Sequence, residues 1–461
     1  MIINGLKIPE DSYRHLSGFV NTFNKNGFEC YLIGGCVRDL ILGYDIYDYD
    51  FATNARPEQV MKLFRRVIPT GIKHGTVTVL AKDLEFEVTT FRSDGKYLDG
   101  RRPDKIHYAD SLDEDVKRRD FTINGMACDL KTGEVIDHVG GMEDLKKGII
   151  RTIGDPVDRF SEDGLRTFRA CRFAAKLGFA IEDGTFEAIS KTLDISAMVS
   201  AERVREELMK LLSAGRPSIG FEYMRKSGLL KLWLPELESC YDIEQNKFHV
   251  HDIYFHSLYS CDAAPVDKPL VRLSALLHDI GKVSTRRVGD DGDYTFYNHE
   301  VIGARLVRKI LKRLKFSNLE SETVNNLVIN HMFHYTEDWS DGAVRRFMRK
   351  VGVENIPDLF ILREADRIGN GSRTGLPEPI MKLQARIDSV IEAENAITVR
   401  DLNIDGNIIM NNFDLGPGPA IGKILHELLE IVLDHPEMNS LEILQEKAAE
   451  IYNSLKEQGH G

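Results

Sequence analysis

The chain has 461 residues, of which 42% are hydrophobic and 29% are charged. This is the composition of a globular protein, and the length exceeds what one ordinary hydrophobic core can organise, so we expect several domains. No apolar stretch approaches the roughly 20 residues that span a bilayer, and no basic N-terminal segment precedes an apolar run, so we expect neither a membrane span nor a signal peptide. The formal net charge of -12 neither supports nor excludes a nucleic-acid partner, because phosphate binding depends on local basic surfaces.

Six cysteines lie scattered along the chain without CxxC spacing. This usage fits the reducing environment of the cytoplasm, where we expect the protein to work. We interpret the cysteines as small packing residues.

The pattern of apolar residues divides the chain into four regions. Residues 1–150 mix strand-like runs with helices and glycine turns, which is typical of an α/β domain; the runs are Cys30 to Ile33, Gly75 to Leu80 and Leu84 to Thr90. Apolar residues at three- and four-residue spacing predict helices over 151–244, and 245–370 holds most of the histidines and also reads as helical. Helix formers dominate 371–461, where a helix is expected to start near Ile421. We therefore predict an α+β multidomain protein.

Two motifs in the first region suit phosphate and metal chemistry. A strand-like run ends in Gly34 and Gly35, where the missing side chains let a phosphate approach the backbone, and a helix begins near Val37. Downstream, Asp48 and Asp50 share one face of a strand, so both carboxylates can bind the same divalent metals. Such a pair suits two-metal nucleotidyl transfer. Either motif alone is more often a turn or a pair of solvated aspartates, whereas the two together are far more specific.

The run LIGGCVRDLILGYDIYDYDFAT at 32–53 resembles the GGxVRD…DxD signature of the DNA polymerase β-like nucleotidyltransferases. Further stretches narrow the resemblance to the class II tRNA nucleotidyltransferases, which comprise the CCA-adding enzymes and related bacterial poly(A) polymerases. These stretches are EVTTFRSDGKYLDGRRPD (87–104), KRRDFTINGMA (117–127), GGMEDLKKGIIRTIGDP (140–156), RFSEDGLRTFRACRFAAKLGF (159–179) and ERVREELMKLL (202–212), with LNIDGNIIM and GPGPAIGKIL near the C-terminus. The resemblance covers nearly the whole chain and implies a polymerase β-like head followed by all-helical neck, body and tail.

The resemblance implies roles for side chains of the head. Asp48 and Asp50 would bind Mg²⁺, and Glu87 would supply a third catalytic carboxylate. The residues implied to bind the incoming nucleotide are Gly34, Gly35 and Arg38 at its triphosphate, and Arg119, Asp120 and Asn124 at its sugar and phosphate. A structural ion pair is the alternative for Arg119 and Asp120.

Asp163 and Arg166 are the residues implied to select the nucleotide. They stand three residues apart, so on a helix they would be neighbours on one face. An arginine fork and a carboxylate can present donors and acceptors to the Watson–Crick edge of a base, and in the family this pair selects CTP and ATP without a template. Arg169 and Arg172 continue the stripe and would contact triphosphate or base. A surface salt bridge is the alternative for Asp163 and Arg166.

The segment RSDGKYLDGRRPDKI at 92–106 corresponds to a family loop that helps to switch specificity from C to A. In enzymes that add only CC this loop is shortened, and here it has full length. The segment therefore favours addition of CCA, or of the terminal A, over addition of CC.

The histidine-rich region indicates a second metal site. The order His256, His278-Asp279, Asp366 resembles the HD phosphohydrolases, in which two histidines and two aspartates bind a divalent metal, and His299 and His331 would complete a second metal position. Imidazole and carboxylate ligands suit Mn, Fe, Ni or Zn. We interpret His249, His251 and His334 as packing or surface residues. Whether this domain is a phosphohydrolase or a scaffold stays open.

The sequence therefore predicts a CCA tRNA nucleotidyltransferase that adds CMP and AMP from CTP and ATP to the 3′ end of tRNA. Its expected parts are a nucleotidyltransferase head (1–150), a helical neck and body (151–244), an HD domain (245–370) and a helical tail (371–461). The alternatives are an A-adding enzyme or poly(A) polymerase of the same class, an HD-type phosphohydrolase with a vestigial head, and a non-catalytic RNA-binding protein, against which the intact Asp48 and Asp50 argue. The expected partners are tRNA, CTP and ATP and no membrane, and the oligomeric state stays open, a homodimer included.

Overall fold

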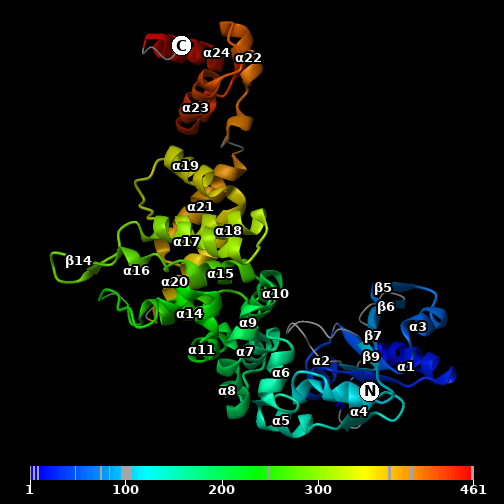
Figure 1. Ribbon diagram of the computed structural model, residues 1–461. Coiled ribbons are helices and arrows are strands. Elements are labelled where there is room, and N and C mark those ends of the chain that lie inside the picture. Colours follow the sequence, from blue (N-terminus) through cyan, green and yellow to red (C-terminus); the bar gives the residue numbers. More distant parts are fainter. Residues whose placement is uncertain are drawn as a thin grey trace. The chain divides into compact units, whose positions relative to one another are not determined.

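A computed structural model of the chain describes residues 2–3, 6–7, 10–46, 48–72, 75–81, 84–94, 106–247, 249–371, 375–393 and 398–457. Its contacts divide the chain into two compact units, whose elements are labelled in Figure 1. Unit 1 comprises Met1–Glu238 with Arg313–Lys315, and unit 2 comprises Ser239–Lys312 with Phe316–Gly461. In the part of the chain that the structure describes, we find no helix that is long and apolar enough to cross a membrane.

Unit 1 begins with a head built on a seven-stranded sheet of order β11-β10-β3-β4-β7-β6-β5. Its strands are β3 (Cys30–Ile33), β4 (Tyr49–Thr53), β5 (Val67–Gly71), β6 (Thr76–Ala81), β7 (Leu84–Thr90), β10 (Met126–Asp129) and β11 (Glu134–Asp137). The predicted strands at 30–33, 75–80 and 84–90 are confirmed, the second with a shift of one residue. Only β4 and β7 pair in parallel among these strands, and their neighbours are antiparallel.

The two faces of the sheet differ because side chains alternate along each strand. In β7 the side chains of Phe86 and Val88 are buried, whereas Glu85 and Glu87 are exposed. On the buried side, α1 (Glu10–Lys25) brings Phe19 to ring-centroid distances of 4.8 Å from Phe51 and 4.6 Å from Phe86. This aromatic core fixes which face of β4 and β7 carries the acidic side chains.

The other elements of the head surround this sheet. Its helices are α2 (Gly35–Leu42), α3 (Pro57–Leu63), α4 (Leu112–Lys117), η2 (Thr122–Asn124) and α5 (Gly141–Lys147). Its short strands are β1 (Ile2–Ile3), β2 (Leu6–Lys7), β8 (Arg92–Asp94), β9 (Ile106–Tyr108) and β12 (Ile149–Ile150), the last of which pairs with β13 (Ala180–Ile181).

The rest of unit 1 is helical, as predicted. Its helices are α6 (Pro156–Glu162), α7 (Leu165–Leu177), α8 (Asp183–Lys191), α9 (Leu193–Ala197), α10 (Ala201–Leu212), α11 (Pro217–Lys226), α12 (Leu229–Trp233) and α13 (Pro235–Glu238). The α7 helix packs against α10 and α11. At Gly220 of α11 a Cβ atom would lie 2.9 Å from the carbonyl oxygen of Cys171, so the small residue permits the close approach of α11 to α7.

One helical prediction needs a correction. The stretch containing Asp163 and Arg166 was expected to form one helix, but it breaks between α6 and α7. Asp163 has an extended backbone, with φ -152° and ψ 106°. Gly164 lies so close to the next layer that a Cβ atom there would be 2.6 Å from the carbonyl oxygen of Ile195. Close packing of the backbone at this glycine therefore overrides the helical periodicity.

Unit 2 is mostly helical. Its elements are α14 (Ile253–Ala263), α15 (Pro269–Leu277), α16 (Lys282–Thr285), β14 (Arg287–Val288), β15 (Tyr294–Thr295), α17 (His299–Arg313), α18 (Asn318–Asn330), α19 (Asp341–Val351), η3 (Val353–Asn355), α20 (Ile356–Gly369) and α21 (Glu378–Glu392). The α14 helix packs against α15 and α20, and α15 packs against α18. At Gly369 a Cβ atom would lie 2.1 Å from the hydroxyl oxygen of Ser260, so a larger residue would separate α14 from α20.

The C-terminal helices of unit 2 form their own core around Leu428, Val432, Leu444 and Ala448. They are η4 (Val399–Asp401), α22 (Gly406–Phe413), α23 (Pro419–Asp434), η5 (Pro436–Met438) and α24 (Leu441–Glu457). The helix expected near Ile421 begins two residues earlier, because a proline suits the first turn of a helix.

Candidate functional site

The acidic site of the head is built by the parallel pairing of β4 and β7. Asp50 of β4 lies directly opposite Glu87 of β7 in this register. Asp48 comes immediately before β4, and both Asp48 and Asp50 are exposed, while Tyr49 between them is buried. The structure therefore brings together the three carboxylates that the sequence singled out, on the solvent side of the sheet.

The charges around Asp50 show how this site would respond to a cation. Desolvation, together with the neighbouring carboxylates of Glu87 and Asp48, raises the pKa of Asp50 to about 6, although Arg119 acts to lower it. Repulsion among carboxylates is relieved by a divalent cation, and oxygen-only donors suit a hard ion such as Mg²⁺. The donor set thus fits the metal that the sequence implied.

Gly34 brings backbone next to this acidic cluster. It precedes α2 with a φ of +84°, a conformation that favours glycine. A Cβ atom at Gly34 would lie 3.3 Å from Nη1 of Arg119 and 4.0 Å from Oδ2 of Asp50. The N-terminus of α2, with its positive end of the helix dipole, therefore lies beside the carboxylates, where it suits an anionic ligand.

Asp115 belongs to this candidate site, although the sequence reasoning did not single it out. Its buried carboxylate accepts hydrogen bonds from Nε of Arg118 at 2.9 Å and from Nη2 of Arg119 at 3.1 Å. Burial acts to raise the pKa of Asp115, but the two guanidiniums outweigh burial and lower it. The carboxylate thus orients Arg119 toward Gly34. The available signal was the spacing, because an aspartate four residues before Arg119 shares its helix face.

The other predicted nucleotide-binding residues form a buried polar network. Arg38 donates from Nη1 to Oδ1 of Asn124 at 2.5 Å, and Asn124 donates to Oδ1 of Asp120 at 3.3 Å. Arg169 of α7 donates from Nε to Oδ2 of Asp120 at 2.6 Å. Burial acts to raise the pKa of Asp120, but the guanidiniums of Arg169 and Arg166 outweigh it and hold that pKa at about 2.

This network continues to the buried Glu207 of α10, which lies 4.0 Å from Nη1 of Arg169 and accepts a hydrogen bond from Nε of Arg172 at 2.6 Å. Arg38 and Arg172 are themselves buried. The structural ion pair considered for Asp120 therefore exists, with Arg169 rather than Arg119 as its partner, and it ties the segment just before η2 to α7.

Asp163 and Arg166 do not pair with each other in this structure. The carboxylate of Asp163 accepts hydrogen bonds from Nη1 of Arg203 at 3.1 Å and from Nη2 at 2.7 Å, and Arg166 donates to Glu162 and to the carbonyl oxygen of Arg159. The i,i+3 salt bridge weighed for this pair is therefore absent from the described contacts. Arg203 was missed as a partner, although it lies in the motif ERVREELMKLL.

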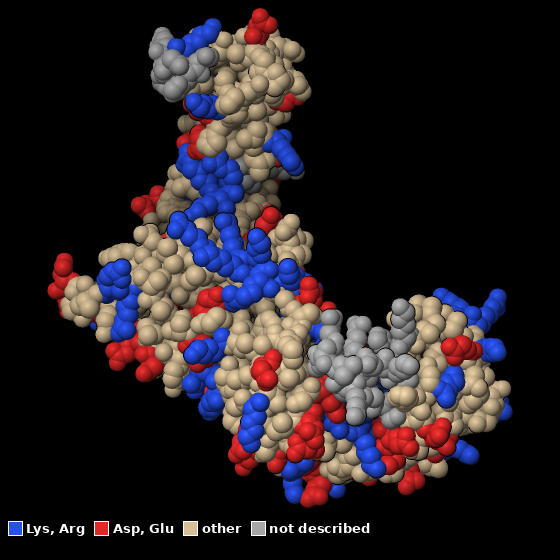
Figure 2. All heavy atoms as spheres, viewed as in Figure 1, with Lys and Arg blue, Asp and Glu red and all other residues tan. Residues whose placement is uncertain are grey.

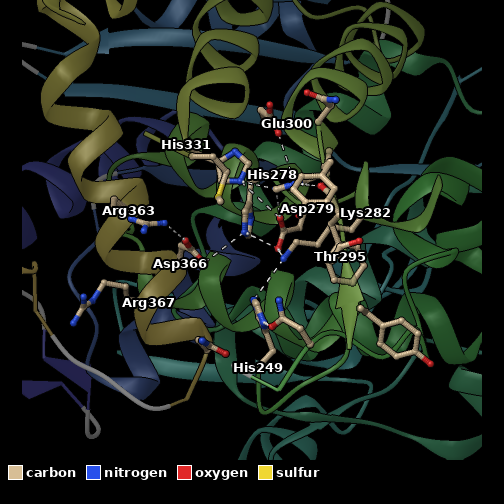
Figure 3. A pocket seen from close by; sticks show the side chains of 18 residues that line it. His249, His278, Asp279, Lys282, Thr295, Glu300, His331, Arg363, Asp366 and Arg367 are labelled. Carbon is tan, nitrogen blue, oxygen red and sulfur yellow. Dashed lines mark hydrogen bonds and ion pairs between the residues drawn. The ribbon is translucent and has the colours of Figure 1, made fainter. Parts of the chain in front are cut away.

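The structure brings together the predicted residues of the histidine cluster in unit 2, four of which are labelled in Figure 3: His278, Asp279, His331 and Asp366. Asp279 lies at the centre, with Oδ2 3.3 Å from Nε2 of His256 and 3.2 Å from Nε2 of His278. Its other oxygen, Oδ1, lies 3.3 Å from Nε2 of His299 and 3.7 Å from Nε2 of His331. Two groups of possible metal ligands thus share one aspartate. Asp366 joins the first group, with Oδ1 3.2 Å from Nε2 of His256.

The backbone sets the orientation of three of these imidazoles. The Nδ1 atoms of His278, His299 and His331 lie 2.7 to 2.8 Å from the carbonyl oxygens of Ala275, Phe296 and Val328, each three residues earlier. A hydrogen bond from Nδ1–H to a carbonyl leaves the lone pair of Nε2 directed into the cluster, which is the usual arrangement of a metal-binding histidine. The donor chemistry therefore fits a divalent transition metal.

Charges within the cluster reinforce this fit. Burial acts to lower the pKa of His278, but Asp279 and Asp366 outweigh it and raise that pKa to about 10. Burial and the neighbouring His278 lower the pKa of His331 to about 3. The carboxylates that attract a proton to His278 would attract a metal cation by the same charge.

The cluster opens into a cavity of about 750 Å³, which Figure 3 shows with its lining side chains. Lys282 also lines this cavity, and its Nζ lies 2.6 Å from Oδ2 of Asp279 and 2.7 Å from Oε1 of Gln245. His249, which was interpreted as a packing or surface residue, lines the same cavity. Lys282 was missed, although it directly follows the motif His-Asp-Ile-Gly.

The specificity loop predicted at 92–106 falls largely on residues 95–105, which lie outside the described residues.

Three family models match the chain in succession. They are the Poly A polymerase head domain at 30–151, the probable RNA and SrmB-binding site of polymerase A at 178–241, and the HD domain at 249–371. These matches agree with an α/β head followed by helical parts.

Named relatives match over almost the full length. The CCA-adding enzyme of Enterococcus faecalis is 46% identical over 438 residues, which cover 95% of each protein. That of Lactococcus lactis is 32% identical over 94% of this chain and 96% of the relative. The crystal structure of the Bacillus stearothermophilus CCA-adding enzyme in complex with CTP has a TM-score of 0.73 and 27% identity, covering 98% of this chain and 100% of that chain. The Thermotoga maritima CCA-adding enzyme complexed with tRNA shares the fold, with a TM-score of 0.55, 20% identity and coverage of 96% of each chain.

Replacing Asp50 by Asn is expected to stabilise the protein at neutral pH when divalent cations are chelated. The carboxyl group has a pKa of about 6 in the folded protein against an ordinary value of 3.8, so the folded state binds more protons between these values. Stability therefore falls as pH rises through this window, and Asp50→Asn removes the loss. Because Asp50 is exposed, solvent screening limits the gain to about 1 kcal/mol or less.

Urea denaturation in a chelator measures this effect. The variant should be more stable than the wild type near pH 8 and equal to it near pH 3. Adding Mg²⁺ should stabilise the wild type more than the variant. A variant that is less stable than the wild type near pH 8 would contradict repulsion at this site.

Proposed function

Because the chain belongs to the family of CCA-adding enzymes, we propose that it adds CMP and AMP, from CTP and ATP, to the 3′ end of tRNA. The observation that carries this function is the 46% identity to a CCA-adding enzyme across 95% of both proteins. The register of β4 and β7 supports it, since it aligns Asp50 with Glu87 on an exposed face. The chain is therefore a nucleotidyltransferase that processes tRNA.

Asp48, Asp50 and Glu87 are the proposed ligands of Mg²⁺. The bound metal would supply activation of the 3′ hydroxyl and charge neutralisation of the triphosphate. The chain itself positions the nucleotide: the N-terminus of α2 at Gly34 and Gly35 receives the triphosphate, and Arg119, oriented by Asp115, adds positive charge beside it. Gly34 has no side chain, so its backbone lies open to the triphosphate. A Cβ atom there would lie 3.3 Å from Nη1 of Arg119 and would narrow the space between them.

The buried network gives the remaining predicted residues a positioning role. Asp120 holds Arg169 at 2.6 Å, while Asn124 holds Arg38 at 2.5 Å. These contacts fix the guanidiniums before a nucleotide arrives, which lowers the entropic cost of ordering them. Arg172 is held in the same way by Glu207.

Asp163 and Arg166 are the proposed selectors of the base. Oδ1 of Asp163 already accepts from Arg203 and from the backbone N–H of Leu165, but among the described residues Oδ2 accepts only from Arg203. The second lone pair of Oδ2 can therefore still accept from the amino group of cytosine or adenine. Glu162 in turn orients Arg166. The pair would read the base through two separately anchored side chains rather than through a mutual salt bridge.

The wider setting of the activity is also proposed. We place the protein in the cytoplasm, supported by six buried cysteines without a disulfide and by a tRNA substrate. The division at 1–150, 151–244, 245–370 and 371–461 stays a prediction, supported by family matches that fall in the first three parts to within one residue.

Incubation of the purified protein with tRNA lacking its 3′ end and each labelled nucleotide tests the function. CCA addition predicts two C and one A incorporated. Incorporation of A alone would instead indicate an A-adding enzyme, and long A tails would indicate poly(A) synthesis. No incorporation at all would overturn the proposal.

Replacing Asp48 or Asp50 by Ala should lower the rate of nucleotide addition by about 1000-fold or more, because each carboxylate is needed to hold the metal. Single-turnover addition with saturating tRNA measures the rate, and circular dichroism checks the fold. Asp183→Ala, which removes an exposed aspartate of α8, is the matched control and should retain full activity. Near-normal turnover in Asp48→Ala or Asp50→Ala would refute their assignment.

Replacing Asp163 or Arg166 by Ala should blur discrimination among CTP, ATP, GTP and UTP, because hydrogen bonds that favour the correct base are lost. Competition between nucleotides in single-turnover reactions gives the preference directly. The control removes a surface pair of similar chemistry with Glu187→Ala, whose partner is Lys191 on α8. If preference is unchanged in both test variants, Asp163 and Arg166 serve only the fold.

A second candidate activity is favoured by the two ligand groups that share Asp279. We infer that His256, His278, Asp279 and Asp366, with His299 and His331, bind a transition metal such as Ni, Mn, Fe or Zn. A metal with an open position would supply a water that is nucleophilic near neutral pH. Lys282 would bind an anionic substrate in the same cavity. Suitable substrates are RNA 2′,3′-cyclic phosphates, which water would open by breaking the P–O3′ bond to leave a 2′-phosphate, or terminal 3′-phosphates, which water would release as inorganic phosphate. Either hydrolysis frees the 3′ hydroxyl that the head extends.

The wild type is expected to retain a transition metal through gel filtration, and His278→Ala/Asp279→Ala is expected to lose it. Metal analysis by mass spectrometry tests this directly, beside a cyclic-phosphodiesterase assay. His334→Ala, an exposed histidine outside the cluster, should keep the metal. A wild type that binds none of Mn, Ni, Fe or Zn would refute the site, and metal without phosphoester cleavage would make the domain structural.

A further inference from the structure

The exposed face of α17 carries a row of cations. Arg305, Arg308, Lys309 and Lys312 follow the spacing i, i+3, i+4, i+7, which places them on one side of the helix, and all four are exposed. Among the described residues, no carboxylate forms an ion pair with any of them at 4 Å or less. In Figure 2, Lys and Arg side chains gather where Figure 1 draws α17, α18 and α19.

Several other cations of unit 2 form ion pairs. Arg346 and Arg349 of α19 both bind Glu430, and Arg386 of α21 binds Asp341. The α17 cations repel one another without such compensation, in a protein whose formal net charge is -12. An anionic partner would remove this repulsion.

A polar pocket of about 570 Å³ adjoins this row of cations. Arg308 and Lys350 are its cations and Glu322 its acidic group, and the rest of the lining comes from α18, namely Asn318, Ser321, Asn325, Asn326, Ile329 and Asn330. Neutral amides offer both donors and acceptors, which suits the edge of a nucleobase or the hydroxyls of a ribose better than a further phosphate.

Two of these amides have unused hydrogen-bonding capacity. Asn325 and Asn330 are more than nine-tenths buried, and the Oδ1 atom of each accepts no hydrogen bond from any described residue. Leaving a buried acceptor unpaired costs stability, so a partner that donates an N–H or O–H group would be favoured here.

We propose that the α17 cations and the asparagine pocket form a binding site for an RNA strand, with phosphates on Arg305, Arg308, Lys309 and Lys312 and one nucleoside in the pocket. Arg308 belongs to both parts, so a phosphate bound there would lie next to the nucleoside. The four cations extend over about 10 Å of helix, which is longer than a single phosphate and favours a strand over a free nucleotide. An acidic peptide would account for the cations but not for the amide pocket.

This site rests on the proposed function only in its choice of RNA, and tRNA lacking its 3′ end is the probe. Filter binding of the full chain at several salt concentrations, without nucleotide, measures affinity apart from catalysis. Arg308→Ala should weaken tRNA binding about tenfold and reduce the salt slope by about 1. Arg287→Ala, which removes an exposed charge from β14, is the control for net charge and should leave the affinity unchanged.

Asn325→Leu tests the pocket with a side chain of similar volume. Because its amide oxygen has no partner in the fold, the variant should keep or raise the melting temperature while weakening tRNA binding about fivefold, with an unchanged salt slope. A lower melting temperature with unchanged affinity would show a structural amide and overturn the pocket assignment.

Two further probes identify other occupants. If Arg308→Ala and Asn325→Leu abolish binding of AMP or CMP but leave tRNA affinity intact, the site takes free nucleotides and the RNA proposal is wrong. If Arg308→Ala weakens only poly-glutamate binding, or if Arg287→Ala weakens tRNA binding equally, the proposal is likewise overturned. A wild type that binds tRNA with this dependence but adds no nucleotide would refute the proposed function and leave the RNA site standing.

Discussion

The parallel pairing of β4 with β7 is the constraint on which the head depends. It sets Asp50 opposite Glu87, and the aromatic core under the same strands determines which face they share. Because side chains alternate, a slip of one residue would turn the carboxylates toward Phe19 and bring Phe51 into solvent. The burial of large aromatic rings opposes such a slip, so the hydrophobic core on one side of the sheet protects the charged site on the other.

The cost of this acidic site is visible in the raised pKa of Asp50. Two other aspartates of the head show the opposite shift. Asp115 and Asp120 are buried and paired with guanidiniums, which lower the pKa of each aspartate. The carboxylate proposed to bind metal thus stays exposed and has a raised pKa, whereas the two that hold arginines are buried and paired. The contrast distinguishes the aspartate proposed as a metal ligand from the aspartates that pair with arginines in the same domain.

In the histidine cluster of unit 2, backbone carbonyls near the ends of helices orient the imidazole rings. His278 and His331 stand directly after α15 and α18, and His299 begins α17. The last carbonyls of a helix lack intrahelical partners, so those of Ala275 in α15 and Val328 in α18 are free to accept from the Nδ1–H of the histidine three residues later. For His299 the carbonyl is that of Phe296, just before α17. This geometry turns each Nε2 toward Asp279, and several helices can converge on one aspartate without a long loop.

The sequence by itself determined the α/β head, the helical remainder and the residues of the acidic site and of the histidine cluster. Glycine turns, the alternation of apolar and polar residues, and the Asp-x-Asp and His-Asp motifs are local signals. Only the tertiary structure decided which charged side chains form ion pairs with one another. Asp163 and Arg166 have the spacing of neighbours on a helix, yet Gly164 packs against the backbone of Ile195 and breaks that helix, so Arg203 and Glu162 become their partners. The sequence did not predict Asp115 or Lys282 as residues of their sites, for a related reason. Their roles come from contacts between elements, and packing chooses among the many partners that a charged side chain could have.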